Sequence, residues 1–384
     1  MDRLTALFNG RLGIQQRALT PYRAEFFDAL AKACSNGLSI FAGVPLAEDT
    51  IATTETLHAA RLAPARNLNL LGGPFYLCYQ RGLLEWLANW DPAALILEAN
   101  QRYLSTPGAV RWMKQRGRPV LGWGLGAPQI TGIFSGLRNT RRSSFLGQFD
   151  GLLTYSRRGA EEYAALGFPA DKIFIAPNAV SPRPVSPLPV RPPEFDGQPC
   201  VLFVGRLQAR KRIDTLLKAC ATLADTRGRK PIHPRLVIIG DGPERIPLEK
   251  LAETIYPTAE FTGEKRASEL VPYFLKADLF VLPGTGGLAV QEALSYGLPV
   301  IMGQGDGTND ELIRPSNGWQ LASPEMLAQV LEEALSDAPR LRAMGAESYR
   351  IAAEEINLER MVETFVQAVS EIQGVVSGHV PPLI

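Results

Sequence analysis

The sequence predicts an α/β protein made of two doubly wound domains, and three observations lead to this prediction. Apolar, strand-like segments alternate with helix-like segments along the whole chain, which is typical of parallel α/β folds. The length of 384 residues suits two domains better than one. A proline-rich stretch, SPRPVSPLPVRPPEFDGQP at 181–199, interrupts the alternation, which restarts beyond it. We interpret this stretch as a semi-rigid linker; the alternative is a surface loop within one domain.

These boundaries divide the chain into four parts. We expect an N-terminal domain over 1–180, a linker over 181–198, a C-terminal domain over 199–355, and a last helix with its tail over 356–384. The hydrophobic content of 46% is enough for two cores. The net charge of +1 gives no overall field that would attract nucleic acid.

The sequence predicts a cytoplasmic protein without a metal site. No apolar run approaches the length of a membrane span, and the first residues lack the apolar core of a secretory signal. Cysteines 34, 78, 200 and 220 are scattered, which favours reduced thiols. The three histidines form no paired ligand motif, and no acidic pair stands at a strand end.

The elements of the N-terminal half follow from the apolar pattern. Strands are expected over 11–17, 37–43, 93–100, 119–126, 151–156 and 172–178, and helices over 21–34, 81–90, 106–117, 136–149 and 157–167. Pro21 opens the first helix. The stretch 44–80 shows no clear pattern.

The C-terminal half has strands that each run into glycine. They are VLFVG at 201–205, RLVIIG at 235–240, AEFTG at 259–263 and DLFVLPG at 278–284. Helices are expected over 212–224, 247–255, 268–277, 287–297 and 324–335, and the segment 347–373 is expected to be helical throughout. Ligands bind at the carboxyl ends of such strands, so the terminal glycines indicate a ligand site.

The residues around these glycines predict a nucleoside-diphosphate site. Glycine lets the backbone approach a ligand closely, and a helix N-terminus offers free N–H groups to an anion. Arg206 and Lys211 supply the cations that a diphosphate needs. A glycine turn at 285–288 leads into a helix that carries Glu292. We infer a bound nucleotide that carries a sugar.

Three segments resemble the donor domain of retaining glycosyltransferases with the GT-B fold, family four in the sequence classification (glycosyl transferases group 1). They are FVGRLQARK at 203–211, VIIGDGPE at 237–244 and ADLFVLPGTGGLAVQEALSYGLPVI at 277–301. Four shorter segments look like bacterial polysaccharide-building members: QRALTPYRAEFFDAL at 16–30, LEANQRYLS at 97–105, DGLLTYSRRG at 150–159 and NAV at 178–180. The resemblance implies two Rossmann-like domains facing a cleft, with the last helix crossing back to the first domain.

The resemblance assigns the donor side of the site. Arg206 and Lys211 would hold the diphosphate and stabilise its growing charge as catalytic groups, and Glu292 would accept hydrogen bonds from the ribose. Taken singly, both cations could be ordinary surface charges. The other expected donor contacts are Gly205, Gly240, Gly263, Thr285, Gly286, Gly287 and Leu288. The donor would be a UDP- or GDP-linked sugar, and no further cofactor is implied.

Two positions depart from the family pattern. A second glutamate, expected eight residues before Glu292, is replaced by Gly284. A histidine expected near the reacting sugar is replaced by Leu125. These departures bear on the sugar that is bound and on activity itself. They favour one alternative, an inactive nucleotide-sugar-binding partner protein. A second alternative is a nucleotide-sugar epimerase of the same fold, which the scarcity of histidine in the N-terminal half disfavours.

The acceptor side is assigned to the N-terminal half. Glu98 is expected to orient the acceptor or act as a weak base; the alternative is a strand-end carboxylate paired with Arg102. Asn100 and Arg102 are expected to bind acceptor hydroxyls or a phosphate. Arg17, Tyr22 and Arg23 surround the first strand–helix turn. They are expected on the acceptor side, and Arg17 could meet either the acceptor or the donor diphosphate from the opposite side. The alternative for the arginines is surface charge.

The segment 134–145, FSGLRNTRRSSF, mixes apolar residues with three arginines. A basic amphipathic helix can lie on an anionic membrane, and a lipid-linked acceptor would require such contact. The alternative is an ordinary helix with a solvated basic face. The expected partners are therefore a nucleotide sugar and a glycan or lipid-linked acceptor, with this segment as a candidate for peripheral contact at the inner membrane face.

Overall fold

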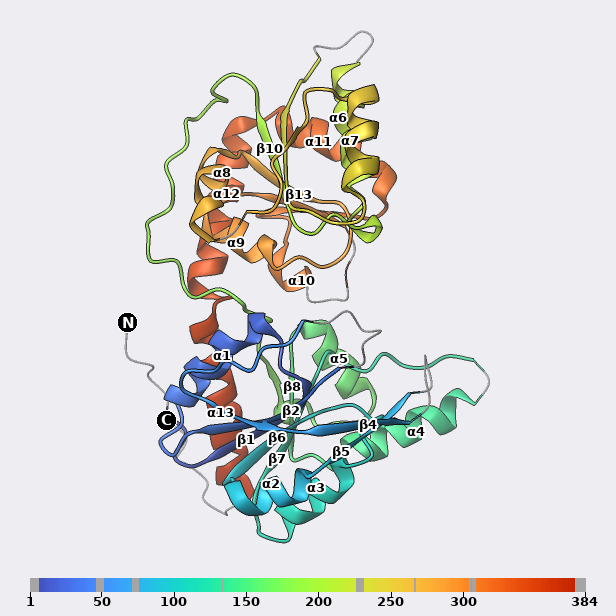
Figure 1. The fold of residues 1–384 in the computed structure, drawn as a ribbon, viewed down its shortest axis with the longest axis vertical. Helices are drawn as coiled ribbons and strands as arrows, with labels where there is room; N and C mark the ends of the chain where they lie inside the picture. The colour runs from blue at the N-terminus through green and yellow to red at the C-terminus, as the bar shows by residue number, and fades with distance from the viewer. Residues whose placement is uncertain are drawn as a thin grey trace. The chain divides into compact units, whose positions relative to one another are not determined.

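The computed structural model describes residues 7–45, 52–70, 76–132, 134–225, 231–265, 267–303, 305 and 309–376. The chain forms two compact units (Figure 1). Unit 1 consists of Met1–Val180 together with Leu358–Ile384, and unit 2 of Ser181–Asn357. The chain therefore connects the units twice, at 180/181 and at 357/358.

Unit 1 contains a parallel sheet whose strand order is β3-β2-β1-β6-β7-β8-β9 in the described part of the chain. Its strands are β1 (Leu12–Ala18), β2 (Leu38–Gly43), β3 (Arg61–Pro64), β6 (Ala94–Glu98), β7 (Val120–Gly124), β8 (Gly151–Thr154) and β9 (Ile173–Ile175). The order reverses between β1 and β6. Parallel strands of this kind leave a ligand-binding crevice at the reversal, beyond their carboxyl ends.

Helices cover both faces of this sheet (Figure 1). They are α1 (Pro21–Lys32), α2 (Leu83–Trp90), α3 (Thr106–Lys114), α4 (Ser135–Leu146), α5 (Arg157–Ala165) and α13 (Leu358–Val376). Helices α1 and α13 pack on each other, and α13 also contacts β8 and β9. Phe26, Trp123 and Phe365 form an aromatic cluster there, with ring centroids 4.8–6.0 Å apart. The opposite face packs on α2 and α3 through Trp86, Leu97 and Met113, among others.

The patternless stretch 44–80 contains an antiparallel hairpin that the sequence analysis missed. Its strands are β4 (Arg66–Leu70) and β5 (Leu77–Arg81), with Arg66 opposite Arg81. The side chains of β4 alternate between exposed and half-buried positions. Short polar strands such as RNLNL carry little apolar periodicity, which explains the omission.

Unit 2 contains a second parallel sheet, of order β12-β11-β10-β13-β14-β15 within the described residues. Its strands are β10 (Cys200–Val204), β11 (Arg235–Ile239), β12 (Glu260–Phe261), β13 (Leu279–Leu282), β14 (Val300–Gly303) and β15 (Gly318–Leu321). The order reverses between β10 and β13, as in a dinucleotide-binding Rossmann sheet. The inner strands β10, β11, β13 and β14 are almost fully buried, because helices cover both faces, whereas the edge strands β12 and β15 are partly exposed.

The helices of unit 2 are α6 (Ile213–Ala224), α7 (Arg245–Ile255), α8 (Val271–Lys276), α9 (Ala289–Ser295), α10 (Asn309–Leu312), α11 (Leu327–Leu335) and α12 (Ala338–Glu354). Short 3-10 helices include η3 (Ala170–Lys172) in unit 1 and η4 (Ala209–Lys211), η5 (Ala267–Glu269) and η6 (Pro324–Met326) in unit 2. Helices α6 and α7 pack side by side, and α6 also packs on α11.

The proline-rich stretch is fastened to unit 2. The Arg191 guanidinium donates to the carbonyl oxygens of Ala277 and Phe274, at 2.9 Å each, and to that of Gly297 at 3.2 Å. Arg342 Nε donates to the Pro192 carbonyl oxygen at 2.7 Å. The segment forms no strand or helix of its own, and side-chain hydrogen bonds hold it against the rest of unit 2.

The prediction of one continuous helix over 347–373 is wrong. Helix α12 ends at Glu354 and α13 begins at Leu358. The Asn357 side-chain amide donates to the carbonyl oxygens of Ala352 and Ala353, at 3.0 Å each. A side chain that bonds these last-turn carbonyls ends the helix, and helical periodicity on both sides conceals such a break.

The four cysteines all lie among the described residues, where each is a buried free thiol. Burial raises the pKa of the Cys34 and Cys220 thiols to about 12 and that of Cys200 to about 11. Burial also raises the pKa of Cys78. The reactive thiolate form is therefore scarce at neutral pH.

Candidate active site

The predicted donor residues gather at the strand reversal of unit 2. Gly205 and Arg206 directly follow β10, and η4 carries Lys211. The loop 283–288 follows β13, the neighbouring strand, and leads into α9 with Glu292. The carboxyl ends of β10 and β13 lie together, so these elements share the edge where doubly wound sheets bind ligands.

The glycines at this edge of the sheet allow the turns after neighbouring strands to pack with their backbones in contact. A Cβ on Gly240 would lie 2.0 Å from the Gly205 carbonyl oxygen, so no side chain fits there. The Gly240 N–H donates to the Gly263 carbonyl oxygen at 2.9 Å. The turns after β10, β11 and β12 therefore touch in a row, as close packing of three strand ends requires.

Lys211 is buried, which excludes the surface-charge alternative for this residue. Its side chain is 6% exposed, and Nζ donates to the carbonyl oxygens of Thr285 at 2.9 Å and Gly286 at 3.2 Å. Burial, with a smaller effect from the Arg210 charge, lowers the Lys211 pKa to about 8. Lys211 thus fixes the glycine loop through its backbone carbonyl oxygens. An ammonium group has three N–H donors, so one remains for a hydrogen bond to a ligand.

Arg206 has the opposite environment. Its side chain is exposed, and it forms no hydrogen bond or ion pair with any described residue. Arg210, which the sequence analysis did not assign, donates from Nη1 to the Thr285 carbonyl oxygen at 3.2 Å. Three cations therefore stand on the segment that follows β10, and two of them, Arg210 and Lys211, bond the carbonyl oxygens of the loop after β13.

Gly284 explains one departure from the family pattern. A Cβ there would lie 2.0 Å from the Arg210 carbonyl oxygen and 2.6 Å from the Lys211 Cα. The Thr285 N–H also donates to the Arg210 carbonyl oxygen at 3.1 Å. The η4 backbone thus occupies the space of any side chain at position 284, including the glutamate expected there.

We expect Gly284→Ala to destabilise unit 2 and weaken nucleotide binding, because the methyl group would push η4 off the loop. Overpacking of this kind costs about 1–3 kcal/mol. Thermal unfolding and nucleotide titration would measure both effects. Gly136→Ala is the matched control, because a Cβ at that α4 position meets no atom within 4 Å. Equal behaviour of the two variants would contradict the close approach.

Glu292 lies half-buried on α9, the fourth residue of that helix. Burial raises the pKa of its carboxyl group. Burial, with a smaller effect from the Glu292 charge, also raises the pKa of Tyr296. Leu288 precedes the helix and is 44% exposed. A carboxylate one turn into a helix that starts at the glycine loop is available to a ligand bound at that loop.

Glu98 lies at the corresponding reversal of unit 1. Its Oε1 accepts a hydrogen bond from the Arg17 backbone N–H at 2.8 Å, and it also bonds the Tyr103 hydroxyl. Burial nevertheless raises the Glu98 pKa. It is not paired with Arg102, whose guanidinium lies 4.7 Å from the Tyr76 ring centroid. The ion-pair alternative is therefore wrong.

A network of side-chain amides supports Glu98, and the sequence analysis missed it. Gln15 accepts from the Glu98 backbone N–H at 3.0 Å and donates to Gln80 Oε1 at 2.5 Å. Gln80 donates to Asn67 Oδ1 at 2.9 Å, and Asn67 donates to the Arg17 carbonyl oxygen at 2.8 Å. The network ties the β4–β5 hairpin to the carboxyl ends of β1 and β6. Glutamine inside the first strand was the one available sequence signal.

A cavity of about 580 Å³ opens at this edge of unit 1. Glu98, Asn100 and Arg102 line it from the β6 end, and Trp123 and Leu125 from the β7 end. Leu125, which stands where the family histidine was expected, is 52% exposed. Three of the predicted acceptor-side residues therefore share one cavity.

Arg23 is buried, so the surface-charge alternative is wrong for this residue. Its Nη2 donates to the Tyr155 hydroxyl at 3.0 Å and to Asn178 Oδ1 at 2.7 Å, and Nη1 contacts Met361 Sδ at 3.6 Å. Its guanidinium also lies 5.4 Å from the Trp123 ring centroid. Tyr22 is 43% exposed beside it. Neither residue lines the cavity, and Arg23 joins α1 to α13.

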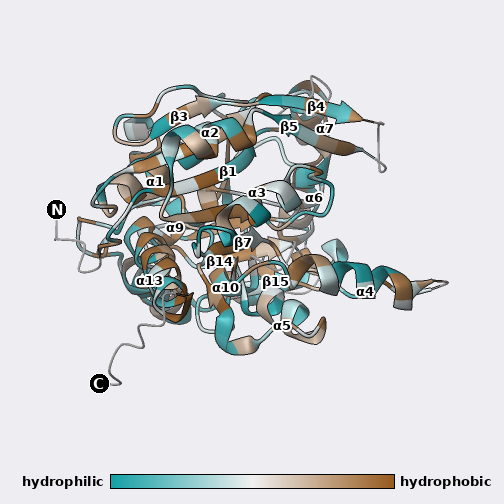
Figure 2. Ribbon diagram, turned by 90° about the horizontal axis from the view of Figure 1, so that it is seen from below, coloured by the Kyte–Doolittle hydropathy of each residue, from teal (hydrophilic) through white to brown (hydrophobic). Residues whose placement is uncertain are grey.

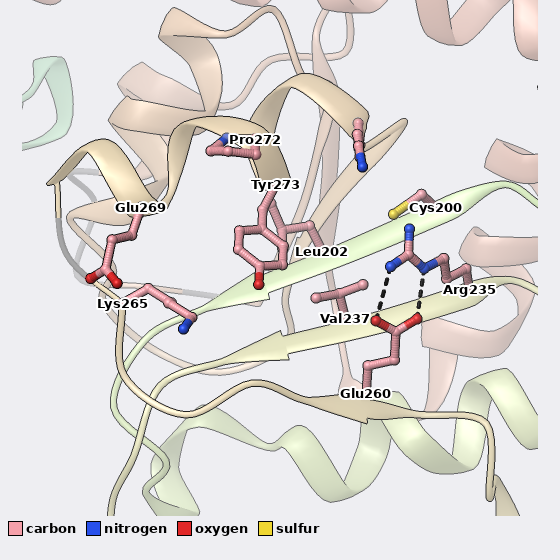
Figure 3. Close-up of a pocket in the computed structure, with 10 residues that line it drawn as sticks. Cys200, Leu202, Arg235, Val237, Glu260, Lys265, Glu269, Pro272 and Tyr273 are labelled. Carbon is pink, nitrogen blue, oxygen red and sulfur yellow. Dashed lines mark hydrogen bonds and ion pairs between the residues drawn. The ribbon is translucent and has the colours of Figure 1, made fainter.

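A second cavity, of about 460 Å³, lies beneath α8 in unit 2 (Figure 3). Leu202 and Val237 form its floor on the sheet, and Arg235 pairs with Glu260 along one side, at 2.6 and 2.9 Å. It contains none of the predicted site residues, and its ion pair already satisfies the charges at that side.

Comparison with known proteins identifies the class. Residues 188–351 match the family described as Glycosyl transferases group 1. Solved structures of similar fold include the lipopolysaccharide outer core galactosyltransferase WaaB (TM-score 0.63, 17% identity, 94% of this chain and 99% of that one). Anabaena HepE in complex with UDP is also similar (TM-score 0.66, 14% identity, 94% and 99%). The protein therefore has the GT-B fold. Its residues 188–351 belong to the glycosyl transferases group 1 family.

Curated relatives agree with this assignment. The GDP-mannose-dependent alpha-mannosyltransferase of Mycolicibacterium smegmatis is 37% identical over 149 residues, 36% of each chain. The lipopolysaccharide core biosynthesis glycosyltransferase LpsE of Rhizobium meliloti is 22% identical over 73% of this chain and 86% of its own. The alignment with the first of these spans about a third of the relative's length.

Proposed function

We propose that the protein is a retaining glycosyltransferase that moves a hexosyl group from a nucleoside-diphosphate sugar to a glycan or lipid-linked acceptor. The observation that carries this proposal is the cationic site at the strand reversal of a group 1 domain, where Lys211 supports the glycine loop and Arg206 is exposed. GDP-mannose is the first donor to test, because four relatives are named as GDP-mannose-dependent mannosyltransferases.

In the proposed reaction, an acceptor hydroxyl forms a bond to the sugar C1 as the bond from C1 to the diphosphate breaks. The bonding electrons go to the leaving phosphate oxygen, which takes the acceptor proton on the same face. Arg206 and Lys211 would stabilise the negative charge on the leaving group, and Glu292 would hold the ribose. Glu98 would orient the acceptor hydroxyl. The two cations fill the role for which other transferases use a metal ion.

A donor panel tests the proposal. UDP-, GDP- and dTDP-sugars are offered with and without a crude glycan acceptor, and nucleotide release is measured. Release that depends on the acceptor supports transfer. Isomerisation of the donor would support an epimerase, and donor binding without turnover would support an inactive partner protein.

We expect Arg206→Ala to lower acceptor-dependent turnover about 10²-fold or more, because it removes a cation from the leaving group. Arg340→Ala is the matched control, since this exposed arginine on α12 pairs with neighbouring Glu333 and lies over the Trp319 ring, away from the glycine loop. Steady-state kinetics with the best donor give the comparison. Turnover unchanged from wild type would remove Arg206 from the mechanism.

We also propose that α4 makes peripheral contact with an anionic membrane. Phe134 and Leu137 are 73% and 58% exposed beside the exposed Arg138 and Arg141, whereas Phe145 is buried. Figure 2 shows α4 mostly in the hydrophilic colour, as its arginines and serines require. Among the described residues, no helix has the length and apolarity to cross a bilayer.

Vesicle cosedimentation tests this contact. We expect the protein to bind vesicles that contain phosphatidylglycerol and to lose most of that binding in Phe134→Ser, because an inserted aromatic ring anchors an interfacial helix. Val185→Ser is the control, since Val185 is 99% exposed but lies in the proline-rich segment. Equal vesicle binding by both variants would contradict the proposal.

A further inference from the structure

The cavity of unit 1 contains more positive charge than a neutral sugar needs. Arg102 lines it from the β6 end and Arg142 from α4. Neither arginine forms an ion pair with a described carboxylate. Two guanidinium groups that face one cavity without a counter-ion favour an anionic ligand.

Both arginines are held in place by groups that leave N–H donors available. The Arg102 guanidinium lies over the Tyr76 ring, which also has Arg17 at 5.8 Å from its centroid. Arg142 donates from Nη1 to the Pro128 carbonyl oxygen. A guanidinium has five N–H donors, so each arginine retains enough for a two-point bond to a phosphate.

The negative groups near the cavity are already engaged. The Glu98 carboxylate accepts hydrogen bonds from the Arg17 backbone N–H and the Tyr103 hydroxyl, so its oxygens already have partners. Glu162 lies beside Gly126 at the cavity wall but pairs with Arg158 at 3.3 Å.

The remaining walls suit the ring of a sugar or polyol. Trp123 and Tyr155 line the cavity with ring centroids 5.7 Å apart, and Phe145 and Leu146 line it from α4. Asn100 adds a side-chain amide. A pocket with aromatic walls and a few polar groups is typical of small-ligand sites.

We propose that this cavity binds an acceptor that carries a phosphate group, with Arg102 and Arg142 as its phosphate-binding residues. The role of this ligand as an acceptor rests on the proposed transferase function, whereas phosphate binding by the cavity does not. The phosphate belongs either to a free sugar phosphate or to a lipid-linked sugar phosphodiester, and both present the same charged oxygens to the arginines.

Direct binding without any donor tests the site. Isothermal titration compares glucose 6-phosphate with glucose, and glucosyl decyl phosphate with decyl glucoside below its micelle concentration. We expect the phosphate-bearing member to bind at least about tenfold more tightly in one pair, since each charge-assisted bond contributes about that factor. Preference in the first pair alone indicates a free sugar phosphate, and a stronger preference in the second pair a lipid-linked one.

Matched variants locate the effect. Arg102→Gln and Arg142→Gln should each reduce the phosphate preference about tenfold, whereas Arg141→Gln should leave it within twofold. Arg141 is exposed on the same helix and does not line the cavity. Equal binding of charged and neutral probes, or an equal loss in Arg141→Gln, overturns the phosphate site. Neither outcome touches the donor site, so the transferase proposal fails only by its own assay.

Discussion

Lys211→Ala is expected to lower turnover by about 10²-fold or more, with the loss in both kcat and donor affinity. The variant removes a cation from the proposed diphosphate site and also removes the two hydrogen bonds that hold the loop carbonyls of Thr285 and Gly286. Steady-state kinetics and nucleotide titration would measure the two losses separately.

Lys218→Ala is the matched control for this variant. Lys218 is an exposed lysine on α6 that pairs with Asp214 one turn away, at 3.1 Å. We expect it to behave as wild type, because exposed pairs of this kind contribute little. Wild-type turnover in Lys211→Ala would contradict the role of the buried lysine.

The same lysine predicts a pH dependence. Its pKa of about 8 means that the ammonium predominates at neutral pH and is half lost near pH 8. The charged form is the one that stabilises a leaving diphosphate, so kcat/KM should fall as the pH rises through about 8. This parameter reports the free enzyme, in which no bound diphosphate raises the lysine pKa. A kcat/KM that stays level to pH 9.5 would contradict this prediction.

Arg23→Ala is expected to destabilise unit 1 by about 3–5 kcal/mol. The variant leaves a cavity between α1 and α13 and removes the donors that bond Tyr155 and Asn178. Arg23→Met should cost about half as much, because a thioether chain refills most of the space. Arg158→Ala, on the surface of α5, should remain near wild type.

Tryptophan fluorescence during urea unfolding is the measurement for Arg23. Four of the five tryptophans (Trp86, Trp90, Trp112 and Trp123) lie in unit 1, so the signal reports that unit. An unchanged midpoint in Arg23→Ala would show that the buried guanidinium makes no net contribution to the packing of α13.

The sequence predicted the positions of some site residues better than their surroundings. Arg206 and Lys211 were predicted at one strand end, because glycine, strand and cation lie within a dozen consecutive residues and local chemistry suffices. The exposure of Arg206 and the burial of Lys211 could not be predicted, since they depend on the β13 loop, 74 residues away in the case of the Lys211–Thr285 bond. Arg23 was equally ambiguous, because its partners Asn178 and Met361 come from distant segments.

The fold shows the same division. Apolar runs that alternate with helical segments predicted most strands of both sheets. Strands that are buried on both faces are apolar along their whole length, so they can be recognised in the sequence. The β4–β5 hairpin depends instead on hydrogen bonds between the side-chain amides of Gln15, Gln80 and Asn67. Such bonds leave no periodic pattern in the sequence. The break after Glu354 depends on one asparagine side chain inside an otherwise helical pattern.

The burial of all four native thiols has a practical consequence. With pKa values raised by burial, they should react slowly with maleimide while the protein is folded. The unmodified chain can therefore serve as a background for site-directed labelling, without prior removal of its cysteines. One new cysteine at Val185 in unit 2 and another at Leu104 in unit 1, both exposed, would accept a fluorophore pair that measures the distance between the two units with and without substrates.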